Sequence, residues 1–321
     1  MIDKITLVKN NISNLEKLQI IDTNNLQFFG NENGTINIYD NAKVKNLTGG
    51  FLIKIYNDKL KIQGSVHKYF NFLKNKKLEN YNLFSMQDFT QTIHKLFINI
   101  GVSNLDFLVV DFEIGLNILV GENDPKEFLR KAQSIGKMDG KERIFYINPK
   151  YKDGRFLCTQ MHKDNTVIFR IYDKNFERTD KGKKNEIPPI VRIETLRTRQ
   201  KNLSLIDFLK VQNLTILQSK FFAEWNLLNF EKEVIAPNGT HQSKKNIAKE
   251  ILLNGTIPTL ENLEYRREQI TPKIYKTSKH FIKYWDNYKV DFYLIPTKIS
   301  PKWDELYNIT IQQLTKINIK N

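Results

Sequence analysis

Residues 107–120 read FLVVDFEIGLNILV, and polar and apolar side chains alternate through most of this stretch. Successive side chains of a β-strand point to opposite faces of a sheet, so the alternation predicts a strand with two unlike faces. One face carries Asp111, Glu113, Gly115 and Asn117. The other carries Phe112, Ile114, Leu116 and Ile118 and is suited to a hydrophobic core.

Three further stretches divide in the same way, which predicts more strands with one polar face. Their polar faces carry Arg170, Tyr172 and Lys174 in residues 166–174, Arg192 and Glu194 in residues 190–199, and Gln63, Ser65 and His67 in residues 60–69. If these strands lie in one sheet, a tyrosine, carboxylates, a histidine and basic groups share a surface. That inventory fits metal-assisted phosphoryl transfer with a covalent nucleophile. It equally fits a solvated sheet face with cross-strand ion pairs, and the residues alone leave both interpretations open.

The remaining patterns predict an α+β fold. Short strands are expected at residues 35–39, 51–56, 143–148 and 154–159. Ser85 to Asp88 resembles a capping box that opens a helix ending at Gly101, and Asp124-Pro125 opens another that ends near Gly136. We expect an antiparallel-rich sheet with helices on one face in residues 1–212. A helical basic domain is expected in residues 213–321, with helices at 217–230 and 244–253 and a loop at 231–241.

The charge of the chain points to a polyanionic partner. The 321 residues carry a formal net charge of +15, and a surplus of this size favours nucleic acid or a membrane surface. No apolar run reaches the roughly 18 residues of a bilayer-spanning helix, which disfavours a membrane protein. The start of the chain shows no signal-peptide core, and the single cysteine excludes a cysteine-rich zinc site, so an intracellular protein is expected.

The order of several short segments resembles the gene II/X replication initiators of filamentous phages and, more distantly, the Rep_trans initiators of rolling-circle plasmids. The matching segments cover about residues 1–210. They are Phe51-Leu-Ile-Lys-Ile-Tyr56, Lys61-Ile-Gln-Gly-Ser-Val-His-Lys-Tyr69, Val110-Asp-Phe-Glu113, Phe169-Arg-Ile-Tyr-Asp-Lys174 with Glu177, and Val191-Arg-Ile-Glu194 with Arg197. The resemblance implies a site-specific nickase that starts rolling-circle replication and forms a 5′-phosphotyrosyl intermediate in the cytoplasm of a bacterial host.

The resemblance also implies roles for individual residues. Tyr172 takes the place of the family's nucleophile, and Glu113 and Glu194 take the places of its acidic metal ligands. Many related nickases use two histidines separated by one residue, but no two of the five histidines here have that spacing. A metal site is therefore expected to be rich in carboxylates and to bind Mg²⁺ or Mn²⁺, with His67 and Asp111 as further candidate ligands.

Basic residues around these segments are candidates for activating the tyrosine or contacting phosphate. Arg170 and Lys174, expected on the same strand face as Tyr172, would stabilise its phenolate. The candidate DNA contacts are Lys181, Lys183, Lys184, Arg192, Arg197 and Arg199. The tail adds clusters of cations and aromatics, and a host helicase or polymerase is a further candidate partner.

Three other functions fit the same patterns. A DNA- or RNA-binding protein without catalysis would show the same charge and aromatic residues. A relaxase or transposase-like strand transferase would share the tyrosine chemistry. A metal-dependent nuclease without a covalent step would keep the carboxylates and would not need Tyr172.

Overall fold

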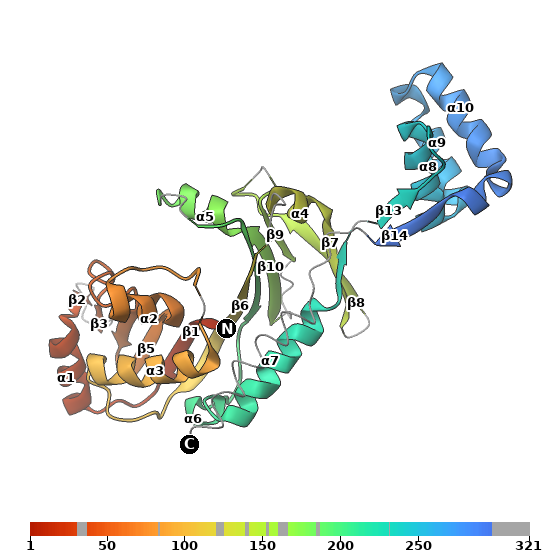
Figure 1. Cartoon of the computed structure of the whole chain (residues 1–321). Coiled ribbons are helices and arrows are strands. Elements are labelled where there is room, and N and C mark those ends of the chain that lie inside the picture. The colour runs from red at the N-terminus through yellow and green to blue at the C-terminus, as the bar shows by residue number, and fades with distance from the viewer. Residues whose placement is uncertain are drawn as a thin grey trace. The chain divides into compact units, whose positions relative to one another are not determined.

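The computed structural model divides the described chain into two compact units, Met1–Asn229 and the residues from Phe230 onward (Figure 1). The residues described are 1–30, 37–82, 84–119, 125–138, 141–151, 154–159, 166–183, 187–230 and 232–296. Lys184 of the candidate DNA contacts lies outside them. The predicted boundary at residue 212 falls within α7 (Val211–Trp225).

The first unit is an α+β fold built on a large antiparallel sheet, as the sequence predicts. Its described strands are β1 (Ile2–Lys9), β2 (Gln27–Gly30), β3 (Asn37–Asp40), β4 (Leu52–Tyr56), β5 (Lys59–Ser65), β6 (Leu108–Leu119), β7 (Ala132–Met138), β8 (Lys141–Ile147), β9 (Phe156–Thr159), β10 (Val167–Asp173), β11 (Ile190–Arg197) and β12 (Leu228–Phe230). Their order across the sheet is β12-β7-β8-β9-β10-β11-β6-β1-β5-β4-β3-β2. The strands with the predicted polar faces, β10, β11, β6 and β5, thus lie near its centre.

Strand β1 occupies the middle of this sheet, between β6 and β5, and the sequence patterns did not predict it. Its pairing with β6 is irregular, because Lys4 lies opposite Glu113 while Ile2 lies opposite the next residue, Ile114. Asp3 is therefore an extra residue on the β1 side, which is the definition of a β-bulge. The bulge interrupts the alternation of side chains that identifies the other strands.

Seven helices accompany the described part of the sheet. They are α1 (Asn14–Asn24), α2 (Val66–Asn75), α3 (Met86–Ile100), α4 (Pro125–Lys131), α5 (Lys174–Asp180), α6 (Leu205–Phe208) and α7. The predicted start and end of α3 are confirmed. Ser85 and Asp88 form a reciprocal capping box, and Gly101 ends the helix with φ 76°.

Two predicted strands end earlier than expected because side chains cap the helices that follow. The Ser65 hydroxyl accepts the backbone N–H of Lys68 at 3.1 Å, so His67 lies in α2 and not in a strand. The Asp173 carboxylate accepts the backbone N–H groups of Asn175 and Phe176, so Lys174 begins α5. A capping acceptor at the first turn favours the helix over continued strand.

Two other predicted elements also differ, besides the helix expected at 217–230, which ends at Trp225 and is followed by β12 (Leu228–Phe230). The helix expected from Asp124 to near Gly136 ends at Lys131, and β7 begins at the next residue. The loop expected at 231–241 contains β13 (Lys232–Ile235). In both places the deciding interaction is pairing with a strand that the local pattern does not reveal: β7 pairs with β8, and β13 pairs with β14 (Tyr293–Pro296).

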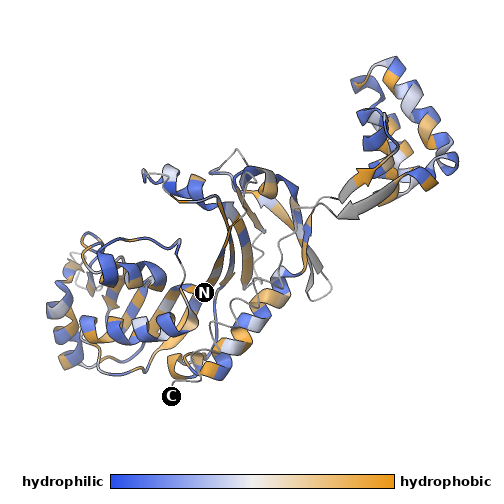
Figure 2. Ribbon diagram, viewed as in Figure 1, coloured by the Kyte–Doolittle hydropathy of each residue, from blue (hydrophilic) through white to orange (hydrophobic). Residues whose placement is uncertain are grey.

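Helix α7 packs on the sheet through an aromatic cluster. The Trp225 indole N–H donates to the Thr195 hydroxyl at 3.0 Å, and its ring meets Phe169 edge-on at 5.7 Å. Arg197 pairs with Glu224 of the same helix. Figure 2 shows hydrophobic and hydrophilic residues interleaved along α7. Because Phe169 and Thr195 alternate with the polar residues of β10 and β11, this core lies behind the polar face of the sheet.

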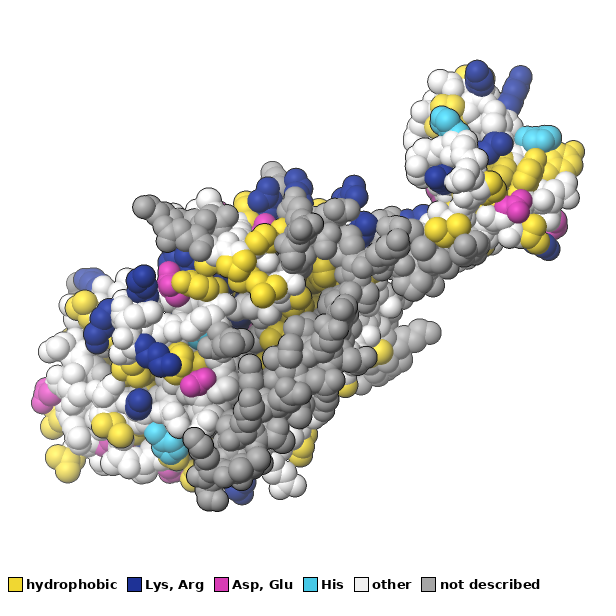
Figure 3. All heavy atoms as spheres, viewed as in Figure 1, with side chains coloured by type: hydrophobic (Ala, Val, Ile, Leu, Met, Phe, Trp, Pro, Cys, Tyr) yellow, Lys and Arg dark blue, Asp and Glu magenta, His cyan; other side chains and the backbone are white. Residues whose placement is uncertain are grey.

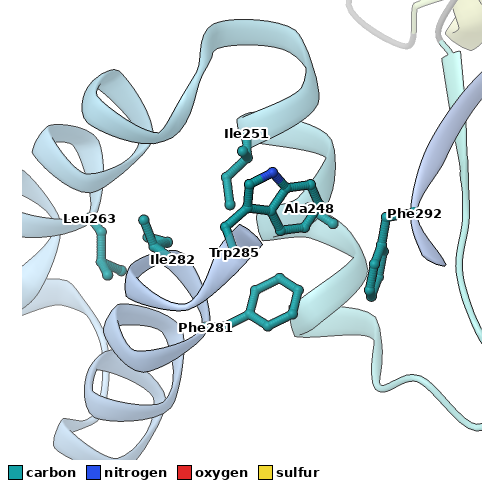
Figure 4. Close-up of a cluster of buried hydrophobic side chains, with 7 residues drawn as sticks. All are labelled: Ala248, Ile251, Leu263, Phe281, Ile282, Trp285 and Phe292. Carbon is teal, nitrogen blue, oxygen red and sulfur yellow. The ribbon is translucent and has the colours of Figure 1, made fainter. Parts of the chain in front are cut away.

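The second unit has its own small core. It contains α8 (Gln242–Asn254), α9 (Thr256–Tyr265), α10 (Pro272–Lys283) and the pair β13–β14. Figure 4 shows the buried side chains that hold it together: Ala248, Ile251, Leu263, Phe281, Ile282, Trp285 and Phe292. Among the described residues of both units, no helix is long and apolar enough to cross a lipid bilayer.

Candidate functional site

Three buried carboxylates meet on the polar face of the sheet. Asp3 of β1, Glu113 of β6 and Glu194 of β11 each offer an oxygen, and these oxygens lie within 4.8 Å of one another. Glu113 and Glu194 are the two acids predicted from strand alternation and from the family resemblance. Asp3 was missed because no pattern in the sequence marks the bulge that carries it.

The bulge explains how Asp3 reaches this cluster. In a regular strand, Asp3 and Lys4 would point to opposite faces. The extra residue lets both side chains reach the same side, where Lys4 Nζ lies 3.2 Å from Glu113 Oε2 and Asp3 accepts from Asn80 Nδ2 at 2.7 Å. Bulges often redirect a side chain next to a functional site. Ser65 also donates to Asp3, which fixes the orientation of the carboxylate.

The Arg192 guanidinium joins two of the carboxylates. It donates to Asp3 Oδ2 at 2.5 Å, to Glu194 Oε1 at 2.7 Å and to Asn117 Oδ1 at 2.9 Å, and only 2% of its side chain is exposed. Gly115 of the neighbouring strand makes room for it, since a Cβ there would lie 2.3 Å from Arg192 Nη2. Arg192 was a candidate DNA contact, but its donors are used inside the protein.

Glu113 is the carboxylate that has an oxygen without a described hydrogen-bond donor. Its Oε2 accepts from Arg170 at 3.1 Å as well as from Lys4, but no described group donates to the buried Oε1. Burial and the nearby Glu194 carboxylate raise the pKa of Glu113 to about 7. A buried carboxylate oxygen without a donor, beside a second carboxylate, is suited to a hard divalent cation such as Mg²⁺ or Mn²⁺.

Tyr172 lies against this cluster. Its hydroxyl donates to Glu194 Oε1 at 2.7 Å, and its ring stacks on Phe156 at 4.7 Å. Burial and the Glu194 carboxylate raise the pKa of Tyr172 well above 10, so the phenol holds its proton in this state. Burial also acts to raise the pKa of Glu194, but Arg192 outweighs it and lowers that pKa to about 2.

Lys174 reaches Tyr172 from a helix and not from the strand face predicted for it. Its ammonium lies 5.7 Å from the centre of the Tyr172 ring and pairs with Glu177 at 2.9 Å. Burial, with the repulsion of Arg192, lowers the pKa of Lys174 to about 8. Lys174 is thus a buried cation next to the tyrosine, while Arg170 stands closer to the carboxylates, 3.8 Å from Glu194 Oε2.

The other two candidate ligands lie beside the carboxylate cluster. His67 Nε2 bonds to Asn82 Oδ1 at 2.8 Å and its ring stacks on Phe84. Burial lowers the pKa of His67 to about 3, so the ring is neutral. Asp111 accepts the backbone N–H of Arg199 at 3.0 Å. Neither residue belongs to the three-carboxylate group.

An open groove of about 560 Å³ leads to Glu113 along the sheet. Its lining includes Lys4, Lys45, Lys68, Arg170, Asp111, Thr6 and Gln63. Cations therefore surround a carboxylate floor, an arrangement that would favour an anionic ligand beside an acidic site. Tyr172 and Glu194 are not among the lining residues, so the tyrosine lies behind the floor.

The remaining predicted DNA contacts occupy different environments. Lys181 is exposed and pairs with Glu177, and Lys183 donates to the Leu78 carbonyl at 2.7 Å. Arg197 is buried and pairs with Glu224. Arg199 is exposed next to the groove residue Thr198. Of this set, Arg199 and Lys181 are the side chains exposed to solvent.

The second unit carries a separate basic surface. Lys273, Lys276, His280 and Lys283 are exposed and follow one stripe of α10, because their spacings of three and four residues match the helical turn. None of the three lysines pairs with a described carboxylate, whereas Lys279 of the same helix pairs with Glu264 at 2.7 Å. Figure 3 shows dark-blue Lys and Arg side chains on this unit.

Comparison with known proteins adds no relative: no protein-family model and no curated protein matches this chain.

Gly115→Ala should displace the Arg192 guanidinium and lower the free energy of unfolding by roughly 3–5 kcal/mol, the usual cost of breaking a buried ion pair. Chemical denaturation would measure this loss. In the double variant with Arg192→Met, the clash is gone, so the two losses should not add. Strict additivity would show that Gly115 serves some purpose other than making room for Arg192.

Proposed function

We propose that this protein is a DNA-nicking replication initiator that cuts one strand through Tyr172 at the origin of a phage or plasmid. The observation that carries the proposal is the contact between the Tyr172 hydroxyl and Glu194, next to a carboxylate cluster at the floor of a cation-lined groove. A tyrosine, carboxylates and cations in that arrangement are the parts needed for covalent phosphoryl transfer. The segment order described above supports the same function.

The carboxylates fit a divalent cation, with Glu113 and Glu194 as the central ligands and Asp3 beside them. Glu113 Oε1 has no described donor, and oxygen ligands favour Mg²⁺ or Mn²⁺. Bound there, the cation would polarise the scissile phosphate and offset its developing negative charge. Asp3 already accepts hydrogen bonds from Arg192, Asn80 and Ser65, so it would contribute mainly its negative charge to the cluster.

The protein's own groups account for the proton transfer. Glu194 accepts the hydroxyl proton of Tyr172, and the phenolate oxygen attacks the phosphorus. The bond to the 3′ oxygen breaks, that oxygen takes up a proton from water while Glu194 releases its proton to water, and the 5′ phosphate stays on Tyr172. Lys174 and Arg170 lower the energy of the negative charge during the step. Because the new bond is again a phosphodiester, religation needs no nucleotide.

A metal-dependent nuclease that uses water is the second candidate. The observation that favours it is the burial of Tyr172, which is 5% exposed and does not line the groove, whereas Glu113 does. In such an enzyme Glu113 and Glu194 would keep their roles. Tyr172 would only orient Glu194, and no protein–DNA adduct would form.

Tyr172→Phe should abolish the covalent adduct with a single-stranded origin oligonucleotide and reduce cleavage by at least about a thousandfold, because the nucleophile is gone. Denaturing gels in Mn²⁺ measure both. Tyr151→Phe is the matched control, since Tyr151 stacks on Phe156 as Tyr172 does. Undiminished cleavage by Tyr172→Phe without an adduct would establish the water-based nuclease, and an undiminished adduct would exclude Tyr172 as nucleophile.

Glu113→Gln should remove most of the stabilisation that Mn²⁺ gives the protein. Saturating metal is expected to add about 3 kcal/mol of stability to the wild type, which is a rise of several degrees in melting temperature. Asp111→Asn is the control, because Asp111 lies on the same strand and lines the groove but is outside the cluster. Equal shifts in the wild type and Glu113→Gln would reject this metal site.

We further infer that α10 of the second unit binds duplex DNA. The helix with its side chains is about 10–12 Å wide, and the major groove is about 12 Å wide. Its basic stripe is exposed, while Phe281 and Ile282 on the other side are buried in the core of Figure 4. The stripe would therefore face phosphates without exposing the core.

Replacing Lys273, Lys276 and Lys283 by Gln should weaken binding to duplex origin DNA and make its salt dependence shallower. Each lost phosphate contact reduces the logarithmic salt slope by about 0.9. Fluorescence anisotropy across a salt series measures the slope. Lys279→Gln is the control because Lys279 is already paired with Glu264. An unchanged slope in the triple variant would exclude α10 from the duplex interface.

A further inference from the structure

Beyond the groove, the polar face of the sheet continues across β5, β4, β3 and β2. Two cross-strand rows define it. In one row Lys61 of β5 lies opposite Lys54 of β4, and in the next Lys59 lies opposite Tyr56. Tyr56 in turn lies opposite Ile38, and Ile38 opposite Phe29. Residues directly opposite one another share a face, so these side chains form one surface, which we call the lysine–aromatic face.

The opposed pair Lys61 and Lys54 is unfavourable in the protein alone. Like charges directly opposite across a strand pair destabilise a sheet, and neither lysine forms an ion pair with a described carboxylate. Asp40 lies opposite Lys54 on the other side, but the two side chains form no ion pair, and Asp40 Oδ1 accepts the backbone N–H of Ala42. Phosphates from a ligand would relieve this repulsion.

The same face offers aromatic rings to solvent. Tyr56 is 42% exposed and Phe29 is 39% exposed, and the Lys43 ammonium lies 5.8 Å from the centre of the Phe29 ring. Rings of this kind stack on unpaired bases, while neighbouring lysines contact the backbone. A duplex keeps its bases paired and stacked, so exposed rings on an open sheet favour a single strand.

The lysine–aromatic face is continuous with the groove that leads to Glu113. Gln63 and Leu52 lie opposite one another on β5 and β4, and both line the groove. On the other side Gln63 lies opposite Thr6, which lies opposite Asp111 on β6. From β6 to β2 the path crosses five interstrand spacings, or about 24 Å.

We propose that the lysine–aromatic face binds single-stranded nucleic acid and guides it along the groove to Glu113. The strand's phosphates contact Lys54 and Lys61, and its bases stack on Tyr56 and Phe29. The role of this binding in nicking rests on the proposed function. The binding itself needs neither the metal nor Tyr172. Its failure is therefore distinguishable from a failure of the nicking chemistry.

The test is binding of a fluorescent oligothymidylate of about twelve nucleotides to the full chain in EDTA. The double variant Lys54→Gln, Lys61→Gln should bind at least about fivefold more weakly, with a logarithmic salt slope smaller by about 1.4, as expected for two lost contacts to a single strand. Tyr56→Ala should also lose about fivefold or more, and Tyr56→Phe, which keeps the ring, should not.

Lys74→Gln, Lys95→Gln is the matched control, because it removes the same charge from exposed positions on α2 and α3. Thermal melting checks folding, and the Lys54, Lys61 variant should melt at or above the wild-type temperature because a repulsion is gone. Weaker binding by this variant alone supports the proposal. Equal binding by the two double variants overturns it, and so does equally tight binding of a duplex that depends on the same two lysines.

Discussion

The site depends on the Arg192 guanidinium, which lies buried between Asp3, Glu194 and Asn117. Three carboxylates within 4.8 Å repel one another, and burial makes each charge more costly. Arg192 offsets two of these charges with direct hydrogen bonds and keeps the pKa of both acids low. This interaction requires a glycine at position 115, because any side chain there would occupy the place of the Arg192 guanidinium.

This arrangement leaves Glu113 with a different role from its neighbours. Arg192 makes no hydrogen bond to it, and burial, with the nearby Glu194 charge, raises its pKa to about 7. Lys4 and Arg170, which line the groove, donate hydrogen bonds to Glu113 Oε2. Its other oxygen, Oε1, has no described donor. The buried arginine therefore creates one carboxylate that would gain from a divalent cation, at the end of a groove lined with cations.

Tyr172 is coupled to the same network through Glu194. Burial raises the pKa of the Tyr172 hydroxyl, and the charged Glu194 carboxylate that would accept its proton raises this pKa further. Covalent chemistry would then require additional positive charge near Tyr172, which the proposed cation and the groove-lining Arg170 would provide. The lysine–aromatic face would supply the strand that brings a phosphate to this place, so that the two proposals describe successive parts of one path.

The sequence by itself determined which residues share the polar face of β6, β10 and β11, because alternation in a strand is a local property with a period of two. Glu113, Glu194, Arg170 and Tyr172 were placed together on that basis. Lys174 and His67 were misplaced although the signals were present, since Asp173 and Ser65 are capping residues that end the strands before them.

The tertiary structure decided what no local pattern contains. The bulge that brings Asp3 to the cluster arises from the register between β1 and β6, which are separated by about a hundred residues of chain. The strand order places β6 between β11 and β1. In this arrangement no described group donates a hydrogen bond to Glu113 Oε1. Such features depend on which strands pair and in which register, and pairing energies come from contacts between distant segments that the sequence of either segment does not specify.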